Sequence, residues 1–136
     1  MRRHATARSV ARVSPDPRQI LGATGERLAL EHLERLGCRL VARNHRTRYG
    51  ELDLVVVDGR TLVFVEVKTR RASAAGPTPW DALDERKRRQ VRRMGRAFLH
   101  DVADRPFGDD VRFDAIGVIV DDAHRLVRLD HLEGAF

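Results

Sequence analysis

With 136 residues, the chain has room for a single hydrophobic core and contains no apolar stretch near the roughly 18 residues that span a membrane, so we expect one domain and no membrane partner. One cysteine, Cys38, excludes an internal disulfide and is typical of a reducing, cytoplasmic environment. The net charge of +6 favours a polyanionic partner such as nucleic acid.

Residues 1–17 are basic, rich in small side chains and closed by two prolines, so we expect a disordered basic tail followed by a single domain over 18–136. The composition of the tail also resembles a mitochondrial presequence, but the tail lacks a long apolar face. A helix is predicted over 18–36, because leucines recur there near helical spacing and Gly37 follows.

Five strands and a second helix are predicted beyond this point. The expected strands cover 39–44, 51–57, 60–68, 111–120 and 125–130, and the helix covers 80–100. We interpret 45–50 as a basic loop and 69–79 as a flexible loop. This order of elements predicts an α/β or α+β fold with a mixed central sheet flanked by helices.

The second and third strands form a predicted hairpin with Asp58 and Gly59 at its turn. A two-residue turn there places Asp53 opposite Phe64, whereas a register shifted by two would place Asp53 opposite Glu66. An even shift leaves the two faces unchanged. One face then carries Glu51, Asp53, Val55, Val57, Leu62, Phe64, Glu66 and Lys68, and the other carries Leu52, Leu54, Val56, Val63, Val65 and Val67.

Three carboxylates and one ammonium therefore gather at one end of an otherwise apolar hairpin. Glu51, Asp53 and Glu66 would repel one another, and Lys68 alone cannot neutralise all three. A hard divalent cation such as Mg²⁺ could do so. Spacing alone leaves a second reading open, in which the sheet simply reaches solvent and the charges form exposed pairs of little energetic value.

The second helix has a basic outer face. Arg88, Arg89, Arg92, Arg93 and Arg96 share one side, with no acid among them, opposite the apolar side. This pattern suits contact with phosphates, although a solvated charged face is the commoner meaning of such a run. Of the 26 Lys and Arg residues only two are Lys, at positions 68 and 87.

Lys87 falls on the apolar side, in the first turn of the helix, and we expect it near the edge of the charged site, unless it extends to solvent instead. We also count Lys87 among the residues expected to contact nucleic acid, with Arg88, Arg92 and Arg96. Further residues could flank the nucleic acid: Arg43, His45, Arg46, Arg48, Tyr49, Arg70 and Arg71.

Several motifs resemble known proteins. Asp53 followed by "EVK" at 66–68 resembles the signature of PD-(D/E)XK nucleases, with Leu52 in place of the proline. Across about 18–136, the segments "GERLALEHLERLG", "RNHRTRYGELDLVVVD", "LVFVEVKTR", "RFDAIGV" and "GAF" are similar to the YraN family of predicted endonucleases, with Gly134 where that family usually has Asn. The "GE" of the first helix is more distantly similar to archaeal Holliday-junction resolvases, which share the superfamily fold.

This resemblance implies a restriction-endonuclease-like αβββαβ core and a metal centre. Asp53 and Glu66, with the backbone carbonyl of Val67, would bind Mg²⁺ or Mn²⁺, and Lys68 would act on the attacking water or the phosphate. Glu26 would either bind the metal through water or complement the start of its helix. Glu51 would bind the metal or, as we prefer, pair with Arg46 or Arg48. The role of Asp114, in "RFD", cannot be read from the sequence.

The expected function is a metal-dependent endonuclease acting on DNA, with branched or structured DNA as one substrate class. Cutting a junction needs two sites, and so implies a homodimer. A non-catalytic nucleic-acid-binding protein with the same fold is the alternative, and an RNA-binding accessory protein is a third reading.

Overall fold

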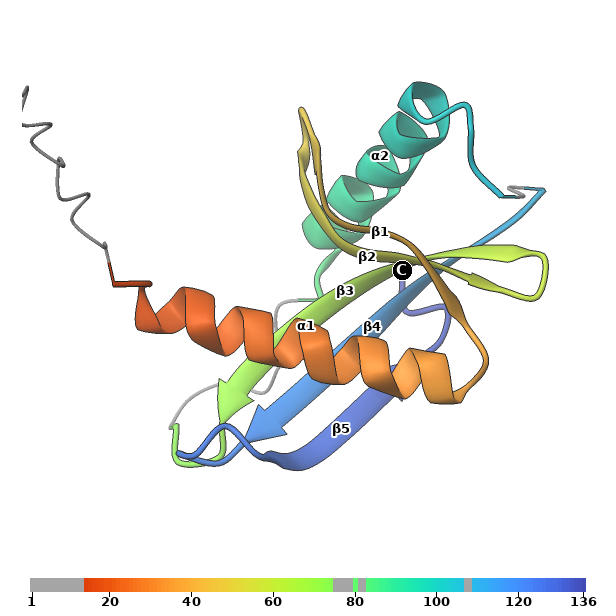
Figure 1. Cartoon of the computed structure of the whole chain (residues 1–136). Coiled ribbons are helices and arrows are strands. Elements are labelled where there is room, and N and C mark those ends of the chain that lie inside the picture. The colour runs from red at the N-terminus through yellow and green to blue at the C-terminus, as the bar shows by residue number, and fades with distance from the viewer. Residues whose placement is uncertain (1–13, 75–79, 81–82, 107–108) are drawn as a thin grey trace, which may run out of the picture.

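The computed structural model describes residues 14–74, 80, 83–106 and 109–136. Within these ranges the chain forms two helices and five strands (Figure 1). In order they are α1 (Pro17–Arg35), β1 (Arg39–Thr47), β2 (Gly50–Asp58), β3 (Thr61–Arg71), α2 (Glu85–Asp101), β4 (Asp110–Val120) and β5 (Leu126–Leu132). This confirms the mixed α/β fold and the order of the restriction-endonuclease-like αβββαβ core, with β5 added.

The expected tail falls mostly on 1–13, outside the described residues. Its end belongs to α1, because Asp16 caps the helix by accepting a hydrogen bond from the backbone N of Arg18 and Pro17 is the first helical residue. Among the described residues, neither α1 nor α2 combines the length and apolar character that crossing a membrane requires.

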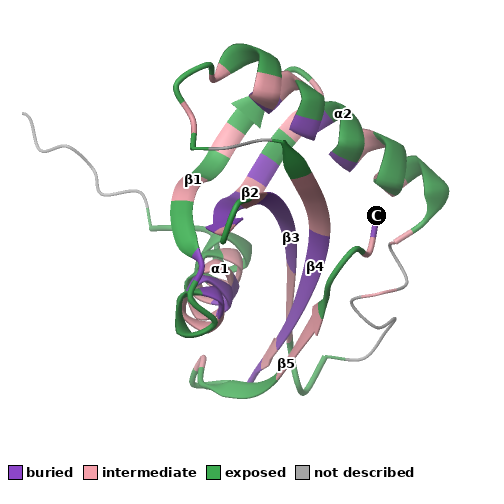
Figure 2. Ribbon diagram, turned by 90° about the vertical axis from the view of Figure 1, so that its right-hand side faces the viewer, coloured by how far each residue is buried: buried purple, intermediate pink, exposed green. Residues whose placement is uncertain are grey.

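A single mixed sheet holds the strands in the order β1-β2-β3-β4-β5. Neighbouring strands are antiparallel, except that β3 and β4 run parallel and α2 lies in the connection between them. α1 covers one face of the sheet and α2 the other, and the buried residues of Figure 2 lie between them along β3 and β4.

Each helix buries one apolar cluster against the sheet. Ala29, Leu30 and Leu33 of α1 pack on Leu54, Val56, Val63, Val65, Val67 and the inner residues of β4. Val91, Met94 and Phe98 of α2 pack on Leu52, Val55, Val57, Leu62 and Phe64. Close packing of α1 depends on Gly25, because a Cβ there would overlap the side chain of Thr69.

Two predicted loops are partly strand, and the second helix is shorter than expected. β1 continues to Thr47 and β2 begins at Gly50, because Arg46 pairs with Glu51 across the sheet and Thr47 closes the turn by hydrogen bonding to Gly50 O. β3 extends to Arg71 because its end pairs with β4. The second helix begins at Glu85, not at residue 80, because Asp84 caps its N-terminus.

The expected register of the β2–β3 hairpin was wrong. Asp58 pairs with Thr61, so the turn residues are Gly59 and Arg60, and Gly59 takes a φ of 61° that glycine adopts without strain. The pairing is shifted by two and ends at Leu54 and Val65, so Asp53 and Glu66 are the next residues on the two strands.

Leu52 also lies on the opposite face of the sheet from the one predicted. Leu52 packs under α2, although strict alternation would put it with Leu54 under α1. The alternation breaks at Asp53. The residue of β1 that faces it is Asn44, between the pairs Arg43–Leu54 and His45–Leu52, and Asn44 has a φ of 50°.

Asp114, whose role was left open, is a buried structural hub. Arg112 binds both of its carboxylate oxygens, at 2.8 and 2.9 Å, and His131 and the backbone N of Gly134 contribute bonds of 2.8 and 3.0 Å. Burial alone would raise the pKa of Asp114, but these hydrogen bonds outweigh burial and lower it. His131 also contacts His32 of α1 at 3.1 Å, so the hub ties β4, β5 and α1 together.

Candidate functional site

The candidate site lies where β2 and β3 part. Pairing between them ends at Leu54 and Val65. On the far side of this pair, β2 continues beside β1 and β3 continues beside β4. Asp53 and Glu66 are therefore the first residues on the two arms of this fork, and Figure 1 shows the β1–β2 hairpin bending away from β3 there.

Asp53 bridges the fork through a hydrogen bond. Its Oδ2 accepts from the backbone N of Val67 at 2.8 Å, so the carboxylate replaces the strand partner that β2 no longer offers. Burial raises the pKa of Asp53, and the neighbouring carboxylates of Glu66 and Glu26 raise it further, to about 7, against the opposing effects of the Val67 bond and of Lys68. Negative charge is therefore crowded around Asp53.

Glu66 is buried and paired with two ammonium groups. Its Oε1 lies 2.8 Å from Nζ of Lys87 and 3.7 Å from Nζ of Lys68. Its side chain is 7% exposed, against 21% for Lys87 and 44% for Lys68, so Lys87 is both the closer and the more buried partner. The expectation that Lys87 lies at the edge of the site is confirmed.

Glu26 reaches the fork from α1. It is in the tenth position of the helix, so the alternative that it complements the helix start is wrong. Burial raises the pKa of Glu26, with Glu51 as the next contribution. With its amide nitrogen turned toward the two acids, Asn44 donates to Glu26 at 3.0 Å and to Glu51 at 3.1 Å. The expected pair of Glu51 and Arg46 is confirmed, at 3.9 Å.

Asn44 is a site residue that the sequence reasoning missed. It was interpreted as the last residue of a strand, with only its place in the "RNHRTRYG" motif to mark it. Asn is one of the few residues that tolerate a positive φ, so an Asn inside a predicted strand was the available signal for a local twist.

The fork supplies oxygen donors of the kind that a hard cation binds. Within the described residues, no group of three or more His, Cys, Asp or Glu side chains is placed to hold a metal ion. Mg²⁺, however, is usually held by one or two carboxylates together with waters and substrate phosphates. Asp53 and Glu66 match that requirement. Burial, followed by the neighbouring carboxylates of Glu66 and Glu26, raises the pKa of Asp53, so a bound cation would stabilise the ionised form.

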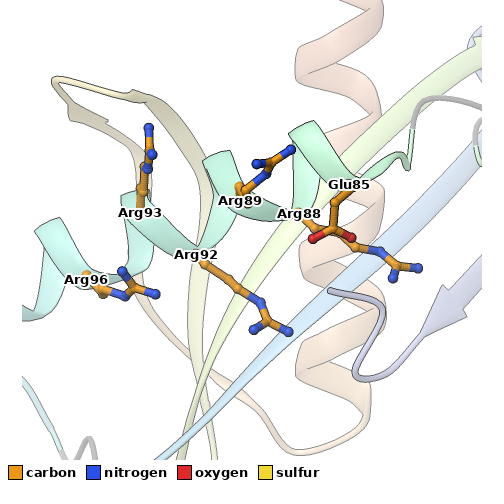
Figure 3. Close-up of a pocket in the computed structure, with 6 residues that line it drawn as sticks. All are labelled: Glu85, Arg88, Arg89, Arg92, Arg93 and Arg96. Atoms are coloured by element: carbon orange, nitrogen blue, oxygen red, sulfur yellow. The ribbon is translucent and has the colours of Figure 1, made fainter.

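The outer side of α2 forms a cationic surface. Five arginines and one acid line a pocket of about 330 Å³ on this helix: Glu85, Arg88, Arg89, Arg92, Arg93 and Arg96. Figure 3 shows Arg89 and Arg93 directed to one side of the helix and Arg88, Arg92 and Arg96 to the other. The structure thus brings together the arginines that the helical periodicity predicted.

The β1–β2 hairpin extends this surface. Arg46, Arg48 and Tyr49 line a second pocket of about 650 Å³ with Arg93 and Arg96 of α2. The guanidinium of Arg48 lies 5.0 Å and that of Arg93 5.9 Å from the centre of the Tyr49 ring.

Arg70 stands apart from these pockets, at the end of β3, and donates to the backbone carbonyl of Ala74 at 3.3 Å. Lys87 points inward to Glu66, so it does not belong to the outer surface with which it was grouped as a nucleic-acid contact.

Comparison with known proteins places the chain in a family. Residues 25–118 match the family described as "Uncharacterised protein family UPF0102". Three relatives carry the name "UPF0102 protein". One from Nocardia farcinica is 45% identical over 97% of this chain and 99% of its own length. A second, from Pelotomaculum thermopropionicum, is 42% identical over 89% of this chain and 98% of its own length. A third, from Mycobacterium tuberculosis, is 45% identical over 84% of this chain and 90% of its own length. The protein whose fork and arginine surface are described above belongs to the UPF0102 family.

Proposed function

We propose that this protein is a divalent-metal-dependent endonuclease that hydrolyses phosphodiester bonds in DNA. The observation that carries the proposal is the meeting of Asp53, Glu66 and Lys68 at the β2–β3 fork, beside a helix with a five-arginine outer surface. The resemblance of these three residues to the PD-(D/E)XK signature supports the same reaction.

The two carboxylates of the fork would hold Mg²⁺ or Mn²⁺. Asp53 and Glu66 provide the charged ligands, and the backbone carbonyl of Val67 is the neutral one. When bound, the cation would lower the pKa of a coordinated water and polarise the scissile phosphate. Glu26, whose pKa is raised by burial and by Glu51, would contribute through a water.

Lys68 would act on the reacting groups. Its ammonium lies 3.7 Å from Glu66 and its side chain is 44% exposed, so a phosphate can approach it. It would orient the attacking water, whose oxygen forms the new bond to phosphorus as the bridging P–O bond breaks, or stabilise the charge that builds on the phosphate oxygens.

The cationic surface would hold the DNA backbone. Its arginines offer contacts to phosphates, which give affinity without reading bases, so we expect recognition of DNA shape rather than sequence. Branched DNA fits such recognition, and a homodimer would supply the two sites needed to cut both strands of a junction.

A non-catalytic DNA- or RNA-binding protein is the second candidate, and the arginine surface alone would support it. The fork favours the nuclease over the binding protein, because binding alone does not require a buried Asp53 whose pKa is raised to about 7.

The test is cleavage of duplex, single-stranded, flapped and four-way-junction DNA, and of RNA, with Mg²⁺ or Mn²⁺. Wild type should cut at least one DNA. Asp53→Asn and Lys68→Gln should lose cleavage and keep binding, while Asp104→Asn, at an exposed position, should behave as wild type. Binding without cleavage by wild type would leave the second candidate.

A further inference from the structure

Of the two ion pairs that Glu66 makes at the fork, the one with Lys87 is the shorter. A buried carboxylate needs a compensating charge, and the 2.8 Å contact with Lys87 provides it. Lys68 shares the same oxygen at 3.7 Å from a more exposed position. Glu66 is thus already paired by a residue from α2, through one of the two carboxylate oxygens that could bind a cation.

Lys87 is held in place by the start of α2. The side chain of Asp84 caps the helix by accepting from the backbone N of Lys87 at 2.8 Å. Almost one turn further on, Gln90 donates to the carbonyl of Tyr49 at 2.9 Å. The inner edge of α2 therefore contacts β3 through Glu66 and the β1–β2 hairpin through Tyr49, and spans the fork.

We propose that Lys87 competes with the divalent cation for Glu66, so that its ammonium pairs the carboxylate until cation and nucleic acid replace it. The inference rests on the proposed function. A cation and an ammonium on one carboxylate repel each other strongly where water is excluded. Removing the ammonium should therefore strengthen cation binding.

The position of Lys87 also couples binding of the divalent cation to binding of nucleic acid. Once it leaves Glu66, the ammonium needs another anion, and the helix that carries it presents five arginines to phosphates. Nucleic acid should therefore raise the affinity for the cation, and by thermodynamic linkage the cation should raise the affinity for nucleic acid by the same factor.

The first test is a calorimetric titration with Mn²⁺, without nucleic acid. Lys87→Gln should bind Mn²⁺ about tenfold more tightly than wild type or better, since an ammonium at contact distance weighs at least that much in a partly buried site. Arg86→Gln removes the same charge from the neighbouring exposed position and should change affinity by less than about threefold. An unchanged or weaker affinity in Lys87→Gln would overturn the proposal.

A second test follows the ammonium itself in the wild-type protein. Because the chain has only two lysines, protein labelled with ¹⁵N in lysine gives two side-chain signals, and a spectrum of Lys68→Gln assigns them. Addition of Mg²⁺ should move the Lys87 signal toward that of a solvated ammonium. A Lys87 signal that stays in place at saturating Mg²⁺ would show that the contact with Glu66 survives, against the proposal.

The outcomes separate this inference from the proposed function. If wild type and Lys87→Gln both fail to bind Mn²⁺, with or without DNA, the metal-dependent nuclease and the competition fail together. If wild type binds Mn²⁺ and cuts DNA while Lys87→Gln gains no affinity, the competition alone is refuted. In Lys87→Gln, DNA should also raise Mn²⁺ affinity less than in wild type.

Discussion

Replacing Asp53 by Asn should stabilise the protein near neutral pH, and by an amount that depends on pH. The folded protein raises the pKa of Asp53 from 3.8 to about 7 through burial, Glu66 and Glu26. Each pKa unit corresponds to about 1.4 kcal/mol, so the ionised carboxylate costs the folded state about 4 kcal/mol as an upper value. The side-chain amide of Asp53→Asn keeps an acceptor for the backbone N of Val67 but carries no charge.

The sign follows from proton binding. Because the pKa is raised on folding, the stability that the protonated group contributes is fully present below pH 3.8 and is lost as the pH rises to about 7. Between about pH 5 and about pH 8, the unfolding free energy of wild type should therefore fall by about 3 kcal/mol relative to Asp53→Asn. Guanidinium unfolding at a series of pH values, without divalent ions, measures this difference.

Two controls sharpen the measurement. Asp104→Asn, at an exposed position, should track wild type at every pH. Mg²⁺ at a hundred times its Kd should add about 2.7 kcal/mol to wild type at high pH and much less to Asp53→Asn. A difference between wild type and Asp53→Asn that stays constant with pH would refute the crowding of carboxylates at the fork.

Three further predictions concern packing, binding and the buried hub. Gly25→Ala should lower the unfolding free energy by about 1–3 kcal/mol, because α1 must move away from β3. Gly22→Ala should instead raise the unfolding free energy by about 0.5–1 kcal/mol, because a Cβ there meets open space. Urea unfolding of the two variants measures both changes. Replacing Arg92 and Arg96 together by Ala should reduce the slope of log affinity for duplex DNA against log salt by about 1–2, and an unchanged slope would place the interface elsewhere. Asp114→Asn should cost about 3 kcal/mol of unfolding free energy, because it leaves the arginine of the hub without its carboxylate, and a loss below about 1 kcal/mol would contradict the hub.

The sequence could predict that Asp53 lies near Glu66 and Lys68, because the Asp58–Gly59 signal places the hairpin turn within one residue of its observed position. Parity alone does not explain the meeting, since the β2–β3 pairing ends at Leu54 and Val65 and the alternation of faces breaks at Asp53. The arginine surface of α2 was equally accessible, because helical periodicity is a local property.

The fork itself could not be predicted. It exists because the end of β3 pairs with β4, more than 40 residues further along the chain, while the start of β2 follows β1. Such long-range pairing leaves no local pattern, so the carboxylate that pairs with Lys87 was also out of reach, although the position of Lys87 at the edge of the site was not.

The fork also explains why an aspartate, rather than an asparagine, at position 53 points to function. The backbone N of Val67 loses its place in the β2–β3 ladder and needs an acceptor, which either side chain would supply. Asparagine would do so without a charge beside Glu66 and Glu26, and the raised pKa of Asp53 measures how unfavourable that charge is. A neutral side chain would serve here without lowering stability, and proteins accept such a loss of stability at functional sites. A cation bound at the fork would turn the same crowding of carboxylates into an advantage, which is the reason to look for chemistry here rather than along the arginines of α2.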